Sequence, residues 1–198
     1  MHSAEKPISA DGRLQRSERS REAIVQALYE LVGEGILEPT AEQVAERAGV
    51  GIRTVFRHFS DMESLFSEMD ARIQAEARPL LEGDSRDHAA SPVDRVRQLA
   101  QLRARLFEKI APYKRAGNLK RARSTYLQSR HMLLVRSLRE DLLRCLPELQ
   151  NAAPELRDAL ELVASFETWD RLRSEQKLSR SRATAALEHL LTVLAKPL

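Results

Sequence analysis

The sequence contains a single cysteine, Cys145, among its 198 residues. One thiol excludes an internal disulfide and any zinc site built from several cysteines, and it suits a reducing cellular compartment. No apolar run approaches the roughly 20 residues that span a bilayer, and the polar N-terminal residues do not have the pattern of a signal peptide. We therefore expect a cytoplasmic protein that does not interact with a membrane.

The sequence also lacks the short motifs of common catalytic and cofactor sites. It has no glycine-rich phosphate-binding loop, no paired-histidine metal motif and no dinucleotide-binding fingerprint. His131 and Cys145 could be imagined as a base and a nucleophile, but Cys145 lies near a predicted helix end without a device to stabilise an oxyanion. We predict that the protein is not an enzyme and needs no metal or cofactor.

The most informative segment is residues 40–57, TAEQVAERAGVGIRTVFR, which predicts two short helices joined by a glycine turn. Thr40 can cap the first helix, with Gln43 three residues later completing a capping box. Gly49 can adopt the left-handed conformation that ends a helix without steric cost. Val55 and Phe59 can anchor the second helix, so that its outward face stays free for DNA.

Charge placement supports this interpretation better than total charge does. The net charge of +3 is compatible with nucleic-acid binding, but a mildly basic enzyme would have the same value. From Ala48 to Ser60 there is no carboxylate, whereas Arg53, Arg57 and His58 all lie on the second helix of the motif. The positive charge is therefore predicted where DNA phosphates would bind.

Residues 44–50, 54–59 and 63–66 together resemble the tetracycline-repressor (TetR/AcrR-like) family of transcriptional regulators. The resemblance implies an all-α homodimer with an N-terminal three-helix, helix-turn-helix DNA-binding domain and a larger helical domain for ligand binding and dimerisation. We expect a disordered arm at 1–16, the DNA-binding domain at 17–61 and the regulatory domain at 62–198. Residues 166–173 and 178–179 resemble the end of the regulatory domain more weakly.

The resemblance also indicates which residues contact DNA. The N-terminal turn of the second helix usually enters the major groove, and a guanidinium such as that of Arg53 can bond guanine O6 and N7, which is worth about 1–3 kcal/mol of discrimination. The alternative for Arg53 is a phosphate contact. Phe56 stands where a tyrosine is commonest and Met62 where a lysine is usual, so we expect a lower salt dependence. Gly51 and Ile52 join Arg53 as base-contact candidates, and the remaining predicted DNA-contact residues are Thr40, Thr54, Phe56, Arg57 and His58.

Hydrophobic periodicity and proline positions predict the remaining elements. The first helix is expected at 20–32, and a long helix that begins near Ser60 is expected to link the two domains. We predict a loop at 79–92, then a helix that ends at Pro112, followed by a solvated basic connector through Arg123. Three further helices are predicted: one to about Leu146, one that carries Leu156 to Phe166, and one that carries Ala183 to Leu194.

Candidates for the regulatory pocket are Phe107, Tyr126, His131 and Trp169. His131 shares a helix side with Leu134 and Leu138, so a polar group on an apolar stripe needs a partner. It can bond a backbone carbonyl in the core, or it can line a ligand cavity with the three aromatic residues. Trp169 can likewise be a core residue or a pocket wall.

The stripe of the last helix permits two interpretations, an intramolecular core or a subunit interface. The family resemblance favours an interface, because the last two helices of such proteins pair with their copies, and a twofold dimer predicts a palindromic DNA operator. The resemblance therefore implies a homodimeric repressor that an unknown small-molecule effector releases from DNA. The rival hypothesis is a helix-turn-helix regulator controlled by a protein partner or without a small ligand.

Overall fold

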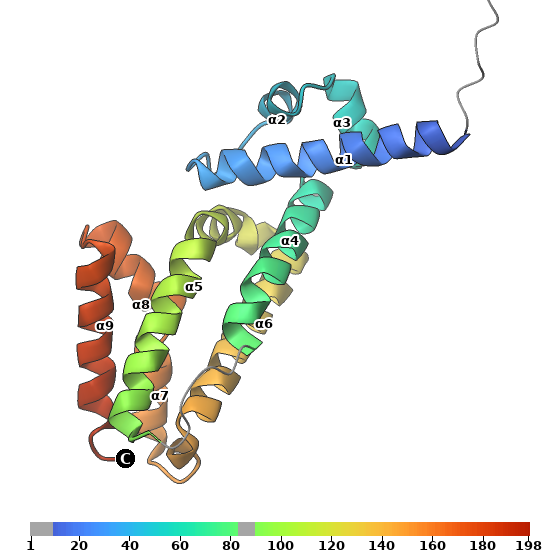
Figure 1. The fold of residues 1–198 in the computed structure, drawn as a ribbon. Coiled ribbons are helices and arrows are strands. Elements are labelled where there is room, and N and C mark those ends of the chain that lie inside the picture. Colours follow the sequence, from blue (N-terminus) through green and yellow to red (C-terminus); the bar gives the residue numbers. More distant parts are fainter. Residues whose placement is uncertain (1–9, 83–89) are drawn as a thin grey trace, which may run out of the picture. The chain divides into compact units, whose positions relative to one another are not determined.

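The computed structural model describes residues 10–82 and 90–198, and all regular structure within these residues is helical (Figure 1). The protein is therefore all-α, as the sequence predicts. It divides into two compact units, Met1–Ile73 and Gln74–Leu198. No helix in the described ranges has the length and apolarity of a membrane span.

The N-terminal unit is built from α1 (Ala10–Gly33), α2 (Ala41–Ala48), α3 (Ile52–His58) and the first half of α4 (Met62–Glu82). α1 contacts both α2 and α3. Apolar side chains from all four helices are buried in this unit, including Leu28, Val44, Val55 and Leu65. Burial of α4 residues beyond position 61 explains why the compact unit reaches Ile73.

Helix α1 begins at Ala10 rather than at Ser20, the start that hydrophobic periodicity predicts. Residues 14–19 are exposed, and Leu14 retains 65% of its accessible surface. Leu, Gln, Arg and Glu in this stretch favour a helix without any burial, so the helix extends beyond its apolar stripe. The disordered arm predicted at 1–16 is therefore helical from Ala10 onward, and residues 1–9 lie outside the described part of the chain.

The C-terminal unit centres on α5 (Pro92–Lys120), which contacts α6 (Thr125–Cys145), α8 (Phe166–Asp170) and α9 (Arg180–Ala195). Figure 1 shows α9 running beside α5. The connecting elements are two 3-10 turns, η1 (Arg121–Arg123) and η2 (Pro147–Gln150), then α7 (Pro154–Val163) and the π-helical turn η3 (Arg171–Glu175). Leu106, Leu142 and Leu160 are among the fully buried residues of this core.

Two predicted helix ends at prolines are wrong. α4 continues through Pro79 to Glu82, and α5 continues through Pro112 to Lys120. A proline inside a helix removes one backbone hydrogen bond and costs about 3 kcal/mol. Burial of Ala111 and Ala116 around Pro112 gives the continuous helix tertiary support that the local sequence does not reveal. The predicted basic connector is therefore helical as far as Lys120.

The helix predicted to carry Leu156 to Phe166 is divided into two. α7 ends at Val163, and Ser165 caps α8 by accepting a hydrogen bond from the Thr168 N–H at 3.2 Å. This break turns Phe166 and Trp169 into the buried face of a separate short helix.

Helix α9 has two apolar faces, which explains the two interpretations of its stripe. Ala183, Leu187 and Leu191 are fully buried within the C-terminal unit and form part of its core. Leu190 and Val193 retain 41% and 46% of their accessible surface. The inward face is thus intramolecular core, and an outward apolar face remains beside it.

Candidate DNA interface

The turn between α2 and α3 has the geometry that its sequence predicts. The Thr40 Oγ1 accepts a hydrogen bond from the Gln43 N–H at 3.3 Å, and the Gln43 Oε1 accepts one from the Thr40 N–H at 2.9 Å. These reciprocal bonds form the capping box at the start of α2. The two helix starts differ, because Gly51 caps α3 without a side-chain hydrogen bond.

Gly49 ends α2 in the left-handed conformation, with φ 65° and ψ 33°. The Gly49 N–H bonds the Glu46 carbonyl at 3.1 Å, and the Val50 N–H bonds the Ala45 carbonyl at 3.0 Å. This pair of bonds is a Schellman motif, which satisfies carbonyl groups that the end of a helix would leave open. The turn therefore fixes the direction in which α3 leaves α2.

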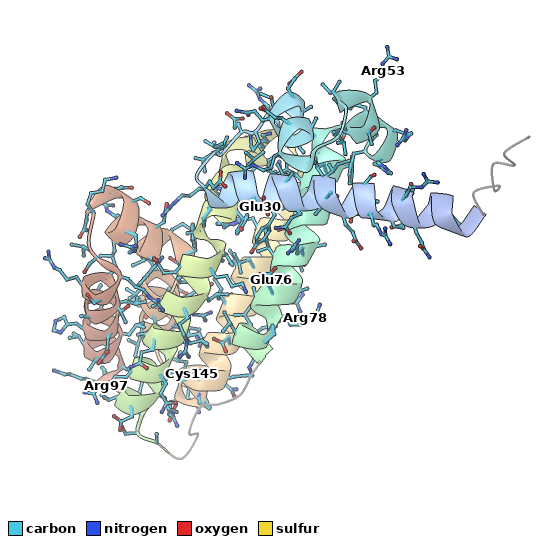
Figure 2. All side chains as sticks on the ribbon, turned by 45° about the horizontal axis from the view of Figure 1, so that its top comes forward. Glu30, Arg53, Glu76, Arg78, Arg97 and Cys145 are labelled. Carbon is cyan, nitrogen blue, oxygen red and sulfur yellow. The ribbon has the colours of Figure 1, made fainter. Side chains whose placement is uncertain are left out.

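Helix α3 is anchored on one side and open on the other. Val55 and Phe59 are 1% and 3% exposed, so they hold the helix to the unit's core. Ile52 and Phe56 are 37% and 49% exposed, and Arg53 projects outward from the helix in Figure 2. A surface with two exposed apolar side chains beside cations can contact both base edges and phosphates.

Four arginines of this unit fall into two groups. Arg21 binds Glu68 through two hydrogen bonds of 2.6 and 3.1 Å and lies 5.1 Å from the ring centroid of Phe59. Its bond to Glu68 raises the pKa of Arg21 and lowers the pKa of Glu68, and the matching bond of Arg47 to Glu34 has the same effect on that pair. These two arginines stabilise the unit.

Arg53 and Arg57 form the other group, because neither makes an ion pair or hydrogen bond with any described residue. Both are exposed on α3. Their charges are therefore available to an external anion, in contrast to those of the two structural arginines.

The other predicted contact residues differ in their exposure and in the hydrogen bonds they already make. The Thr40 hydroxyl is engaged in the capping box, and Thr54 is half-buried. His58 has its Nε2 buried without a hydrogen-bond partner, so this atom reaches a phosphate only if the ring turns. Gly51 is exposed, and a Cβ added there would meet nothing within 4 Å, so its backbone is open to a close approach.

Of the predicted pocket residues of the C-terminal unit, Phe107 packs against Phe166, a residue that the sequence places only on an apolar stripe. Phe107 meets Phe166 edge to face at 5.7 Å, and the Trp169 Nε1 donates a hydrogen bond to Glu108 at 3.2 Å. Both aromatic candidates are fully buried, as core residues would be. Tyr126 is half-buried.

His131 has a partner that neither sequence interpretation named. Its Nδ1 lies 2.8 Å from the Nζ of Lys114, and the pKa of His131 is lowered, first by burial and then by Lys114 and Arg121. The Lys114 Nζ lies 5.8 Å from the centroid of the Phe166 ring, which links His131 to the aromatic cluster. No sequence spacing indicates this contact, because the two residues lie on different helices.

Among the described residues, no group of three His, Cys, Asp or Glu side chains is placed to hold a metal ion. The exposed second helix of a capped helix-turn-helix is instead the geometry of a protein that reads DNA in the major groove. The family described as bacterial regulatory proteins, tetR family, matches residues 21–69, which include all of α2 and α3. Residues 21–69 of the chain therefore match the DNA-binding part of this family of transcriptional regulators.

The similarity to solved structures covers more of the chain than the family match does. A transcriptional regulator from Rhodococcus sp. Rha1 is similar at a TM-score of 0.62 and 17% identity, covering 91% of this chain and 96% of its own. One from Aquifex aeolicus VF5 has a TM-score of 0.59 and 14% identity, with 88% and 98% covered. NalD of Pseudomonas aeruginosa, the secondary repressor of a multidrug efflux pump, has a TM-score of 0.53 and 23% identity, with 91% and 95% covered. No curated protein sequence matches the chain.

Proposed function

We propose that this regulator is a cytoplasmic, homodimeric repressor that binds a palindromic operator and is released from it by a small-molecule effector. In this proposal residues 17–61 read DNA, and residues 62–198 bind the effector and the second subunit. The description of NalD as a repressor supports the sign of regulation. The observation that carries the DNA-binding step is the exposed pair Arg53 and Arg57 on an α3 free of carboxylates.

Within this interface we assign base contact to Gly51, Ile52 and Arg53. Arg53 is exposed and makes no ion pair among the described residues, so its guanidinium can bond a guanine without first breaking a contact. Contacts to phosphate and sugar would position the helix without specifying sequence. We assign these contacts to Thr40, Thr54, Arg57 and His58, and we assign to Phe56 a packing contact with DNA that involves no hydrogen bond.

Exposed apolar side chains on α7 and α9 support the homodimer. These two helices contact each other, and Leu162, Leu190 and Val193 retain 67%, 41% and 46% of their accessible surface. Burying them against a second copy would remove apolar surface from water. A twofold dimer then presents two copies of α3, and these require two half-sites in inverted orientation.

Effector control requires that the ligand bind the DNA-incompetent arrangement more tightly than the DNA-bound one. A difference of about 1.4 kcal/mol in binding free energy gives a tenfold change in operator affinity. We assign the effector to the C-terminal unit, where Phe107, Tyr126, His131 and Trp169 remain the candidate contact residues.

The test begins with in vitro selection of DNA sequences that bind the purified protein, followed by fluorescence anisotropy at constant salt. We expect a palindrome bound by a dimer and released by at least one compound from a panel of small molecules. Recovery of no preferred sequence would contradict operator recognition. Specific binding that no compound disturbs would favour the rival regulator, one controlled by a protein partner or without a small ligand.

Two variants test the assignment of contacts. Replacement of Arg53 by Ala should relax preference at one base position of each half-site, with a loss of about 1–3 kcal/mol of discrimination. Replacement of His58 by Ala should weaken all sequences alike, because phosphate contacts carry no sequence information. If Arg53→Ala weakened every sequence equally, the base contact would have to be reassigned to phosphate.

A further inference from the structure

The positive charge of the chain is concentrated in the segment 109–139, which contains nine of the 32 Lys and Arg residues and none of the 29 Asp and Glu residues. The segment includes the second half of α5, η1 and most of α6. Carboxylates from outside it neutralise some of these cations. The ion pairs are Lys109–Glu76, Arg115–Asp170, Arg136–Glu140 and Arg139–Glu161.

Lys114 and Arg121, two other cations of the segment, both bind the side-chain amide of Asn118. The Asn118 Oδ1 accepts hydrogen bonds from the Lys114 Nζ at 3.0 Å and from the Arg121 Nη1 at 3.2 Å. Both cations are half-buried. Because the amide oxygen serves both cations, the Asn118 NH₂ group is left as a donor.

His131 completes the group from α6. Its Nδ1 lies 2.8 Å from the Lys114 Nζ, and an ammonium can only donate, so the proton of the neutral imidazole is on Nε2. Four side chains that carry hydrogen-bond donors are therefore joined by contacts where α5 meets α6, and the Lys114 Nζ also lies 5.8 Å from the centroid of the buried Phe166 ring.

The positive charges near His131 affect its pKa. Lys114 and Arg121 both act to lower the pKa of His131, in addition to its burial, whereas Glu167 acts in the opposite direction. Holding like charges together in a partly buried place is unfavourable. An oxyanion would offset that repulsion and form charge-assisted hydrogen bonds, which are stronger than neutral ones.

We propose that the α5–α6 junction is a binding site for an oxyanion, the carboxylate or phosphate group of a small ligand, formed by Lys114, Asn118, Arg121 and His131. That this ligand is the effector rests on the proposed function, but anion binding itself does not. The effector would then be an organic acid or phosphate ester and not a cation or a neutral compound.

The test uses the full-length protein and four probes: inorganic phosphate, sulfate, benzoate and the neutral analogue benzamide. Total ionic strength is held constant with chloride. Trp169 is the only tryptophan of the chain and is buried on the same helix as Phe166, so its fluorescence reports on the site without DNA. We expect saturable binding of benzoate and of at least one inorganic anion, and none of benzamide. Absence of saturable anion binding would overturn the proposal.

Matched variants then locate the site. Lys114→Gln and His131→Gln should each weaken anion binding about tenfold or more, since each removes a donor, and in the first case a charge-assisted one. Arg123→Gln is the control, because it removes an exposed charge from the same segment. It should change the affinity less than twofold. Equal weakening by all three variants would indicate diffuse charge attraction and would overturn the proposal.

A measurement on the unmodified protein tests the site even if the variants fail to fold. NMR titration of the His131 ring, assigned by comparison with His131→Gln, should give a higher pKa in saturating benzoate than in chloride, because the bound anion favours the charged imidazole. An unchanged pKa at saturation would place the anion elsewhere.

Operator binding separates failure of the site from failure of the proposed function. If anions bind at the α5–α6 junction but no organic anion releases the operator, the site stands and its role as effector site is wrong. If a compound releases the operator equally from the unmodified protein and from Lys114→Gln, effector control stands and the inference about its ligand is wrong.

Discussion

The two glycines of the helix-turn-helix, Gly49 and Gly51, provide a test in which stability and DNA binding respond separately. A Cβ added at either position would meet no heavy atom within 4 Å, so neither alanine substitution creates a clash. The positions differ in backbone conformation, because φ is 65° at Gly49 and −73° at Gly51. Only the first of these values is unfavourable for alanine.

The expected magnitudes follow from that difference. Alanine in the left-handed conformation costs about 1–2 kcal/mol. The substitution also restricts the unfolded chain, which offsets about 0.4–1 kcal/mol of that cost. Gly49→Ala should therefore lower the free energy of unfolding by about 1 kcal/mol, or the melting temperature by about 2–4 °C for a chain of this size. Gly51→Ala keeps an allowed backbone but exchanges the glycine cap of α3 for a poorer one, so its net effect should be close to zero.

The assay combines thermal unfolding with operator binding measured well below the melting temperature. Gly49→Ala should melt earlier and bind normally, whereas Gly51→Ala should melt normally and bind more weakly, because its new methyl group lies where the backbone approaches DNA. Normal melting of Gly49→Ala would refute the argument from the left-handed turn. Normal binding by Gly51→Ala would remove Gly51 from the interface.

Two further predictions concern ion pairs. Arg103 and Asp141 are both 0% exposed and lie 3.0 Å apart, so Asp141→Ala should destabilise the protein by about 3–5 kcal/mol in thermal or urea unfolding. Glu140→Ala, which breaks an exposed pair, should cost less than about 1 kcal/mol, and equal losses would contradict the burial argument. In the N-terminal unit, Arg21 lowers the pKa of Glu68. The pair therefore stabilises the fold at pH values above the ordinary glutamate pKa of about 4.3. This stabilisation is lost as the pH falls through the lowered pKa of the folded protein. Glu68→Gln should therefore be less stable than the unmodified protein at pH 7 but equally stable at the lowest pH, and a constant difference at every pH would refute the linkage.

The helix-turn-helix could be predicted from sequence because its signals are local. The capping box at Thr40 joins residues three positions apart, and the glycine that ends α2 is the one residue type that adopts its conformation without cost. The apolar anchors Val55 and Phe59 are likewise spaced within one helical turn. Each signal can be recognised without knowledge of the remaining fold.

The parts that could not be predicted depend on contacts between distant residues. Local rules favour a helix end at Pro112, and only tertiary burial on both sides shows why α5 continues. The contact of Lys114 with His131 joins residues 17 positions apart on different helices. A buried arginine such as Arg103 gives no sequence sign of its partner, because exposed and buried arginines look alike in a sequence.

The distribution of formal charge between the two units explains why placement must matter more than total charge in DNA binding. Residues 1–73 contain nine Lys and Arg but thirteen Asp and Glu, a formal charge of −4, whereas residues 74–198 carry +7. An acidic DNA-binding unit gains little from diffuse attraction to the duplex. Several carboxylates are held in internal ion pairs, and α3 has none, which leaves Arg53 and Arg57 facing outward. Because Arg57 is the one arginine per subunit that we assign to phosphate, the salt dependence of binding should be shallow, and discrimination must come mainly from base contacts at the start of α3.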